Sequence, residues 1–285
     1  MANGKNPECP DVDDAPLLRF SLKGHYKITE YDTLTGEIKP FGAKIQGENT
    51  VFSRKWHMHD SLLLYLEKGE IVSLLGVSGS GKTTLFNVLS GLYNPERGKV
   101  YLNGDDITAK PGQISYMLQK DLLLPHYTVI DNVALPLVIK GESKKSAREK
   151  AEEYFPVFGL DGYEKKYPSQ LSGGMRQRAA LMRTYLSSKG VALLDEPFSA
   201  LDTITKNAVH MWYLDVMKKI ELSTVFVTHD IDEAILLSDR IYIMSGKPGK
   251  ITEEIKIDIK KPRTNDVMLT EEFLTYKRKI VEKLG

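Results

Sequence analysis

The stretch Gly76-Val77-Ser78-Gly79-Ser80-Gly81-Lys82-Thr83 decides the fold that we expect for this chain. It follows an apolar run, Glu70 to Leu75, which predicts a buried strand, and it opens a segment from Lys82 to Leu92 whose apolar residues have helical spacing. The pattern GxxxxGK[ST] in this strand–turn–helix setting is typical of a phosphate-binding loop. We therefore expect an α/β domain that begins with a nucleotide site.

The residue types in this loop suit phosphate chemistry. Glycines let backbone N–H groups turn toward the phosphates, and the helix start adds a partial positive charge. Lys82 is expected to reach the β and γ phosphates, and the Thr83 hydroxyl to ligate Mg²⁺. A flexible Gly/Ser turn that happens to hold a lysine is the alternative. The predicted nucleotide-binding residues here are Gly76, Val77, Ser78, Gly79, Ser80, Gly81, Lys82, Thr83 and Thr84.

A second apolar run, Val191 to Leu194, ends in the acids Asp195 and Glu196. A buried strand can aim acids at its end without placing charge in the core. We expect Asp195 beside the Mg²⁺ and Glu196 beside the γ phosphate. Taken alone, two acids at a strand end also fit a solvated turn.

Apolar runs and helical patterns alternate along most of the chain, which predicts a mostly parallel sheet covered on both faces. Further strands are expected over 224–228 and 240–245, and a β-type stretch over 99–107. The expected helices span 129–139, 144–158, 173–186, 204–220, 231–237 and 271–284. Residues 1–50 form an extension with short β-type runs, and residues 51–285 form the main domain. Within it, we expect mostly helix over about 120–175 and a tail with a helix over about 250–285.

The composition narrows the possible functions. The 285 residues hold 39 Lys and Arg against 38 Asp and Glu, so no basic field favours nucleic acid as a partner. Cys9 is the single cysteine, which excludes an intramolecular disulfide and fits a reducing, cytoplasmic location. The N-terminus lacks the pattern of a signal peptide, and no apolar run could cross a bilayer. A partner would have to supply any membrane spans.

The stretch Leu171-Ser172-Gly173-Gly174-Met175 resembles the LSGGQ signature of the ATP-binding cassette (ABC) ATPases, with Met175 in place of the glutamine. Gln119 resembles the family's Q-loop glutamine, Ser199-Ala200-Leu201-Asp202 its D-loop, and His229 its switch histidine. The resemblance covers residues 50–285 and implies a P-loop NTPase of ABC type, with a mostly parallel core sheet, an antiparallel edge sheet and a small helical subdomain.

The resemblance also implies roles for these residues and a dimer with two shared ATP sites. Glu196 would act as general base, assisted by His229 and Gln119. Mg²⁺ would be held by Thr83, Gln119 and Asp195. The residues implied to reach the ATP of the opposite subunit are Ser172, Gly173, Gly174, Gln177 and Asp202. The implied cofactors are ATP and Mg²⁺.

The family also places an aromatic ring against adenine, upstream of the phosphate loop. Trp56 is our first choice and Phe52 the second. Tyr26, within LLRFSLKGHY, would serve if residues 27 to 55 are an insertion. Trp56 could equally be a core residue.

Longer stretches such as LLLPHYTVIDNVALPL and THDIDEAILLSDRIYIMSGKPGKI resemble ATPase subunits of the nitrate, sulfonate and taurine importers, a group that includes bicarbonate and thiamine-precursor importers. This resemblance implies an ATPase at the cytoplasmic face of the membrane that powers uptake of a small, anionic solute. Its partners would be a second copy or a paralogue, transmembrane permease subunits and an extracytoplasmic solute-binding protein. Leu122, Leu123, Leu124 and Pro125 would contact the permease, or else pack internally.

Three other functions compete with this interpretation. A soluble ABC ATPase acting on nucleic acid or ribosomes would carry a long coiled coil between Gln119 and Ser172, where only about fifty residues are present. An ABC exporter subunit would share the motifs. A P-loop kinase would leave the sequence LSGGMRQR unexplained.

Overall fold

The computed structural model describes residues 63–95, 98–246 and 249–284, with side chains from Leu64 onward. Ahead of residue 63 it describes only the backbone of four short strands. These are β1 (Leu18–Ser21), β2 (Thr29–Asp32), β3 (Ile38–Pro40) and β4 (Phe52–Lys55).

A six-stranded sheet forms the centre of the described chain, with strand order β13-β12-β6-β11-β10-β9. All neighbouring strands run parallel except β13, which is antiparallel to β12. The mostly parallel sheet expected from the sequence is therefore confirmed. The strands are β6 (Ile71–Gly76), β9 (Ser115–Met117), β10 (Val191–Asp195), β11 (Ser223–Thr228), β12 (Arg240–Ser245) and β13 (Lys250–Lys256).

Two of these strands were not expected from the sequence. Strand β9 has three residues, too few for a pattern to emerge. Strand β13 lies at the sheet edge and carries mostly polar residues, so the tail from about residue 250 begins with a strand before its helix.

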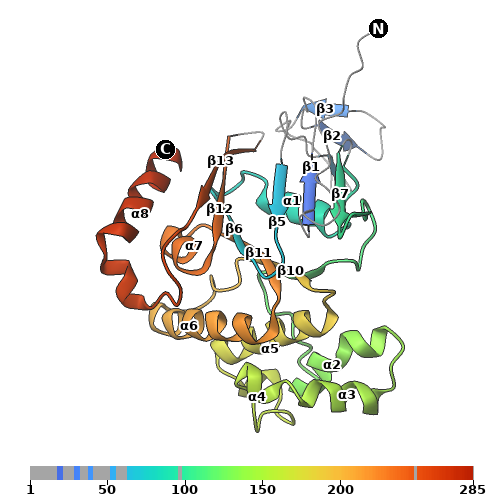
Figure 1. Cartoon of the computed structure of the whole chain (residues 1–285). Helices are drawn as coiled ribbons and strands as arrows, with labels where there is room; N and C mark the ends of the chain where they lie inside the picture. Colours follow the sequence, from blue (N-terminus) through green and yellow to red (C-terminus); the bar gives the residue numbers. More distant parts are fainter. Residues whose placement is uncertain are drawn as a thin grey trace.

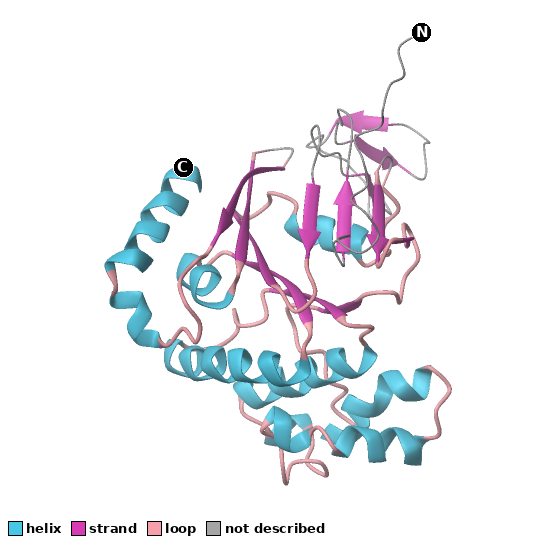
Figure 2. Ribbon diagram, viewed as in Figure 1, coloured by secondary structure: helices cyan, strands magenta, loops and turns pink. Residues whose placement is uncertain are grey.

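Helices cover the two faces of this sheet (Figures 1 and 2). Strands β6, β10 and β11 are buried along their whole length, as expected for a sheet covered on both sides. Successive residues contact opposite faces: Ala192 and Leu194 pack with α5 and α6, whereas Leu193 packs with α1. The helices are α1 (Lys82–Leu89), α2 (Val129–Ile139), α3 (Lys144–Glu152), α4 (Phe155–Phe158), α5 (Gly173–Ser187), α6 (Thr203–Ile220), α7 (Ile231–Leu237) and α8 (Glu271–Leu284), with short 3₁₀ turns at Pro168–Gln170 and Asn265–Leu269.

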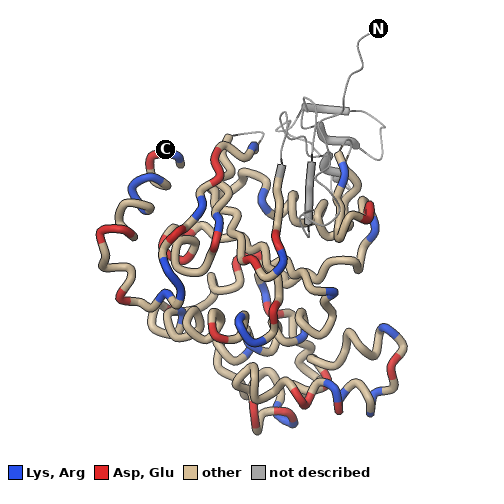
Figure 3. The backbone as a smooth tube through the Cα atoms, viewed as in Figure 1, with Lys and Arg blue, Asp and Glu red and all other residues tan. Residues whose placement is uncertain are grey.

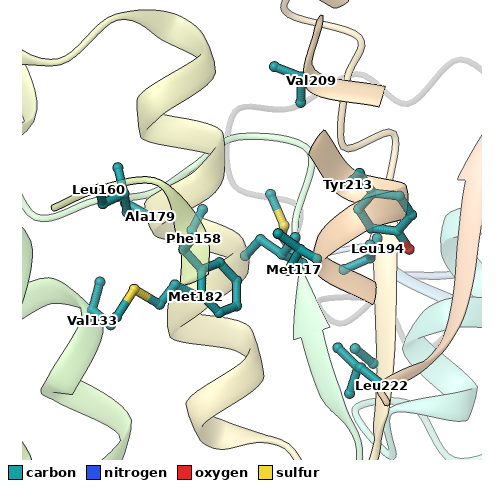
Figure 4. Close-up of a cluster of buried hydrophobic side chains, with 14 of the residues drawn as sticks. Met117, Val133, Phe158, Leu160, Ala179, Met182, Leu194, Val209, Tyr213 and Leu222 are labelled. Atoms are coloured by element: carbon teal, nitrogen blue, oxygen red, sulfur yellow. The ribbon is translucent and has the colours of Figure 1, made fainter. Parts of the chain in front are cut away.

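One large apolar core joins the helical region to the sheet. Phe158 of α4 and Met182 of α5 pack beside Met117 of β9, and the core continues through Leu194 to Tyr213 of α6 (Figure 4). Because this core is continuous, helices α2 to α4 are attached to the sheet through the signature-bearing helix α5.

The prediction of a single helix over residues 144–158 is wrong. The structure has α3 ending at Glu152 and a separate short helix α4 from Phe155. Pro156 lacks the N–H that would bond to the carbonyl of Glu152, so the first helix cannot continue through it.

An antiparallel sheet of order β5-β1-β7-β8 lies beside α1, with β5 at Leu63–Leu66, β7 at Lys99–Leu102 and β8 at Asp105–Asp106. Strand β1 pairs with both β5 and β7, and Phe20 is opposite Leu64 and Val100. Strand β1 of the expected extension thus pairs with strands on the other side of the expected boundary at residue 50.

Strands β2, β3 and β4 form their own sheet, with order β3-β2-β4. Strand β1 pairs directly with β5, which follows this three-stranded sheet in the sequence. Residues 29–55 therefore form an insertion between two neighbouring strands.

The C-terminal helix α8 packs on α7 and on the edge of the central sheet. Phe273 and Ile280 of α8 are buried against Ile235 of α7 and Ile255 of β13. Basic and acidic residues are intermixed along the described backbone (Figure 3). None of the helices within the described ranges has both the length and the apolar character needed to cross a membrane.

Candidate functional site

A cavity of about 590 Å³ opens at the carboxyl ends of β6, β10 and β11. Its volume lies within the usual range for a small-molecule site. The phosphate loop, the residues after Asp195 and the switch histidine meet here although they are far apart in the sequence. Its lining residues are Ser78, Gly79, Gly81, Lys82, Thr83, Thr84, Gln119, Glu196 and His229.

The phosphate loop joins β6 to α1 through a backbone that only glycine adopts easily. Gly79 and Gly81 have φ angles of 80° and 100°, in the left-handed region. At Gly76 the reason is space, because a Cβ there would lie 2.3 Å from the carbonyl oxygen of Met244. The backbone angles at Gly79 and Gly81 and the lack of space at Gly76 explain why glycines occur at these positions of the motif.

Lys82 is the first residue of α1, and its side chain folds back into the phosphate loop. Its Nζ donates to the carbonyl of Gly76 at 2.7 Å and to that of Val77 at 3.0 Å. Burial lowers the pKa of Lys82, and the nearby charges of Glu196 and Asp195 oppose that shift. The ammonium group thus already lies at the centre of the loop, where phosphate oxygens would replace the carbonyls as partners.

Asp195, at the end of β10, accepts two hydroxyl hydrogen bonds on the same oxygen. Thr83 of α1 donates to Oδ2 at 3.1 Å, and Tyr116 of β9 donates at 3.2 Å. Burial raises the pKa of Asp195, and these two donors act in the opposite direction. Sequence reasoning missed Tyr116, whose strand was too short to be recognised.

Carboxylate and hydroxyl oxygens are the ligands that Mg²⁺ prefers, and this ion is usually held by one or two side chains together with phosphates. Asp195 and Thr83 form such a pair. Gln119 faces Glu196 instead, at 3.1 Å. Within the described ranges, no three His, Cys, Asp or Glu residues cluster as a metal site. The residues present therefore fit a Mg²⁺ ion that arrives with a nucleotide.

Glu196 lies between the two other predicted catalytic residues. Its Oε2 accepts from Gln119 Nε2, and its Oε1 lies 3.2 Å from Nδ1 of His229. The backbone of Glu196 is in the left-handed region, with φ 45°, and its N–H donates to the carbonyl of Val227. The strain of that conformation for a residue with a side chain is offset by this bond to β11.

The signature residues lie away from this cavity. Ser172 is exposed and caps helix α5 by accepting a hydrogen bond from the N–H of Met175 at 3.3 Å. Gly173 is partly exposed. Gly174 is buried, and a Cβ there would lie 3.3 Å from side chains of Thr205 and Val209 on α6. Close packing of α5 on α6 thus favours a glycine at position 174.

Gln177 differs from its predicted role. Its side chain is 5% exposed and faces the interior with Phe198 and Tyr213, so it is not placed to contact a second subunit. Gln177 follows the exposed Ser172 by five residues, which places it about 140° further around the axis of α5, on the buried face of the helix. Asp202, in contrast, is exposed at the start of α6, where it accepts from the N–H of Thr205 at 3.0 Å.

The side chains proposed to stack on adenine, Trp56, Phe52 and Tyr26, lie outside the side chains that the structure describes. Phe52 belongs to β4 by its backbone. The separate sheet formed by β2, β3 and β4 nevertheless meets the condition under which Tyr26 would take this role, namely that the residues after it are an insertion.

The segment after Gln119 is fixed by side chains from two helices. Arg183 of α5 donates to the carbonyls of Asp121 and Leu122, and Arg176 pairs with the Asp121 carboxylate at 3.3 Å. Asn132 of α2 is fully buried and bonds to both the N–H and the carbonyl of Leu124. Leu123 is buried, so the internal-packing alternative holds for this residue. Leu122 and Leu124 are exposed on a fixed backbone.

The family model described as "ABC transporter" matches residues 59–199. A formylaminopyrimidine import ATP-binding protein of Halalkalibacterium halodurans is 43% identical over 216 residues, which cover 76% of this chain and 83% of that protein. An aliphatic sulfonates import ATP-binding protein of Bacillus cereus is 39% identical, with coverage of 79% and 87%. A nitrate import ATP-binding protein of Synechocystis is 36% identical, with coverage of 76% and 84%.

Solved structures agree with this assignment. A dimeric ATP-binding cassette bound to ADP and Pi is 27% identical, has a TM-score of 0.61, and matches over 84% of this chain and 98% of its own. A Clostridium perfringens component of an ABC transporter complex is 20% identical with a TM-score of 0.67, over 94% of this chain and 96% of its own, and supports the fold. The fold and the site define a P-loop ATPase, and the chain belongs to the ABC transporter ATP-binding family.

Proposed function

We propose that this ATPase powers an ABC importer of a small, anionic solute. The observation that carries the proposal is the convergence of Lys82, Glu196 and His229 on one cavity, with Asp195 bonded to the lining residue Thr83, in a chain whose relatives are named as import subunits. The sulfonate and nitrate relatives favour an anionic solute, which distinguishes this proposal from import of a formylaminopyrimidine. Its place would be the cytoplasmic face of the membrane.

The arrangement of residues suits hydrolysis of the γ phosphate. Lys82 and the loop N–H groups would bind the phosphates, and Thr83 and Asp195 would hold Mg²⁺, which neutralises phosphate charge when bound. Glu196 would take the proton of the attacking water, because its carboxylate lies at the cavity wall. Gln119 contacts one carboxylate oxygen of Glu196 and His229 contacts the other, so the two residues would keep the carboxylate oriented.

A second subunit would complete each site. Among the described residues that line the cavity, none comes from the signature at 171–175. Ser172 is exposed at the N-terminus of a fifteen-residue helix, where backbone N–H groups favour an anion. We infer a head-to-tail dimer of this chain, or of this chain with a paralogue, in which Ser172 and Gly173 face the ATP of the opposite subunit. The related cassette that binds ADP and Pi is dimeric.

The segment 121–125 would contact the permease. Leu122 and Leu124 are exposed, and the carbonyls beside them are already bonded to Arg183 and Asn132. A partner could therefore bury these leucines without ordering the loop, which reduces the entropy cost of binding. An extracytoplasmic solute-binding protein would deliver the solute to that permease.

The alternative of a soluble ATPase that acts on nucleic acid or ribosomes is less well supported. Residues 120–172 form three short helices that share one core with α5, and the described chain has no long coiled coil there. Because acidic and basic residues are nearly balanced in number, the chain also has no excess positive charge that would attract nucleic acid.

Replacement of Glu196 by Gln tests the catalytic role. The amide preserves shape but cannot accept the proton, so we expect ATP binding within twofold of wild type and hydrolysis slowed by about 100-fold or more. The variant should form an ATP-trapped dimer on size exclusion. Asp215→Asn, at an exposed position of α6, is the matched control. Wild-type turnover of Glu196→Gln would contradict this role.

The importer itself is tested with the membrane complex purified from the source cells. The pair Leu122→Asp and Leu124→Asp should abolish co-purification of the permease while ATP binding by the chain is kept. Leu269→Asp, at a leucine outside the segment that is even more exposed, should leave assembly unchanged. Unchanged assembly with both aspartates would refute the docking surface. ATP-driven uptake of radiolabelled sulfonate or nitrate by the reconstituted complex tests the solute class.

A further inference from the structure

A buried polar cluster lies directly behind the switch histidine. At its centre is Glu233 of α7, which is 4% exposed. One carboxylate oxygen accepts a hydrogen bond from the hydroxyl of Thr228, and the other lies 2.8 Å from Nε2 of His210. The ammonium of Lys206 lies 3.6 Å from the same oxygen as His210. A buried carboxylate is costly unless such partners compensate it.

The cluster holds the chain on both sides of His229. Thr228 precedes the histidine at the end of β11, and its hydroxyl also accepts from the N–H of Asp230 at 3.0 Å. Asp230 follows the histidine, accepts from Lys206 at 2.6 Å, and caps α7 by accepting from the N–H of Glu233 at 3.2 Å. The backbone of His229 is therefore fixed at both neighbours, while its own side chain is 63% exposed and reaches the cavity.

The other side of the cluster belongs to α6. Lys206 and His210 are one turn apart on this helix, whose first turn is capped by Asp202. The ring of His210 packs edge-on against Phe198, two residues after Glu196. Glu233 thus joins the end of β11, just before His229, to α6, the helix that Asp202 caps.

We propose that Glu233 is a positioning residue that fixes His229 relative to Glu196 and to the helix starting at Asp202. The proposal rests on the function proposed above for His229. The cluster could instead simply attach α6 and α7 to the sheet. The bonds to both neighbours of His229 favour positioning, because helix packing alone would not require Thr228 and Asp230 to take part.

The proposal is tested by Glu233→Gln, which keeps the volume but cannot accept from both Thr228 and His210 while neutralising Lys206. We expect kcat for ATP to fall by about tenfold or more, with the ATP dissociation constant within twofold of wild type. Asp232→Asn removes a carboxylate from the same turn of α7, one that pairs with Lys277 at the surface, and should change neither value. An unchanged kcat for Glu233→Gln would overturn the proposal.

Thr228 offers a milder pair of variants if Glu233→Gln does not fold. Thr228→Val removes only the hydroxyl, and Thr228→Ser keeps it. Valine should lower kcat, and serine should restore it to near the wild-type value. Equal kcat values for the two variants would show that the hydroxyl bond to Glu233 has no role in positioning.

Two further measurements separate positioning from general stability. In a His229→Ala background, Glu233→Gln should lower residual kcat by less than twofold, because the group it positions is gone. The NMR signal of the His229 ring, assigned by its loss in His229→Ala, should shift in Glu233→Gln and stay in place in Asp232→Asn. An equal loss of kcat in both backgrounds, or an unmoved ring signal, would overturn the proposal. If His229→Ala has wild-type kcat, the role of His229 fails instead.

Discussion

Thr83 and Asp195, 112 residues apart in the sequence, are joined by a hydrogen bond of 3.1 Å, and Thr83 lines the cavity. The bond connects the first turn of α1 to the end of β10. Tyr116 donates to the same carboxylate oxygen from the neighbouring strand. Two hydroxyl groups thus set the orientation of the carboxylate that we propose to hold Mg²⁺.

Tyr116→Phe should weaken the binding of Mg²⁺ without affecting the binding of the nucleotide itself. It removes one hydrogen bond to Asp195, of about 1 kcal/mol, so the half-saturating Mg²⁺ concentration for ATP hydrolysis should rise about fivefold. The ATP dissociation constant, measured by equilibrium titration in EDTA, should stay within twofold of the wild-type value. Tyr101→Phe, on the antiparallel sheet, serves as the control. An unchanged Mg²⁺ requirement would show that Thr83 alone orients the carboxylate.

Lys82→Ala should lower ATP affinity about 10- to 100-fold, because it removes charge-assisted bonds worth about 1.5–3 kcal/mol. Equilibrium titration with a fluorescent ATP analogue measures this. Lys218→Ala, at an exposed position of α6, is the control. Wild-type affinity of Lys82→Ala would remove the basis for the phosphate loop assignment.

Mixing two inactive chains tests whether the ATP sites are shared. Ser172→Arg places a bulky side chain at the exposed signature and leaves Lys82 of the same chain intact. In a heterodimer with Lys82→Ala, one composite site keeps both wild-type halves and the other carries both changes. Some ATPase activity should therefore reappear in the mixture, measured with the membrane partner if the isolated chain is inactive. A fully active Ser172→Arg homodimer would argue against a shared site.

We propose that Tyr26 stacks on adenine, since β2, β3 and β4 form their own sheet between the paired strands β1 and β5. Tyr26→Ala should lower ATP affinity about 5- to 100-fold, as expected for losing an aromatic contact of about 1–3 kcal/mol. Trp56→Ala and Phe52→Ala should change it by less than twofold. Titration with ATP and with inorganic triphosphate separates contacts to adenine from contacts to phosphate. Tyr26→Ala should weaken the binding of ATP and leave the binding of triphosphate unchanged. A loss of ATP affinity in Trp56→Ala, with none in Tyr26→Ala, would assign the stacking role to Trp56 instead.

Strand β1 and the insertion should differ in their contribution to stability. Deletion of residues 1–28 removes β1 from between β5 and β7 and exposes Leu64 and Val100, so the midpoint of thermal unfolding should fall by more than about 5 °C. Replacement of residues 29–55 by a Gly/Ser linker should lower it by less. Ser21 and Leu63 are directly paired, so a short linker can connect these strands. Equal melting points for the deletion and the full chain would contradict the role of β1.

The site residues could be predicted from the sequence because the chemistry that they carry depends on short stretches of neighbouring residues. Backbone N–H groups around a phosphate require glycines followed by Lys82 and Thr83, and an aimed carboxylate requires a strand that ends at Asp195. Helix bounds such as 231–237 were also recoverable, since apolar spacing and the capping residue Asp230 are adjacent in the sequence. The ABC signature then identified the family.

Contacts between distant segments could not be read from the sequence. Gln177 follows the signature, yet the packing of α5 on α6 directs it inward. Tyr116 and Glu233 have no motif of their own, and they gain a role only because β9 pairs with β10 and α7 packs behind β11. The membership of β1 in the domain likewise depends on pairing across forty residues. The sequence determined which groups could bind a nucleotide, because that chemistry is encoded in short motifs. Only the tertiary structure decided which other side chains orient those groups, because burial and hydrogen bonding depend on neighbours supplied by other parts of the chain.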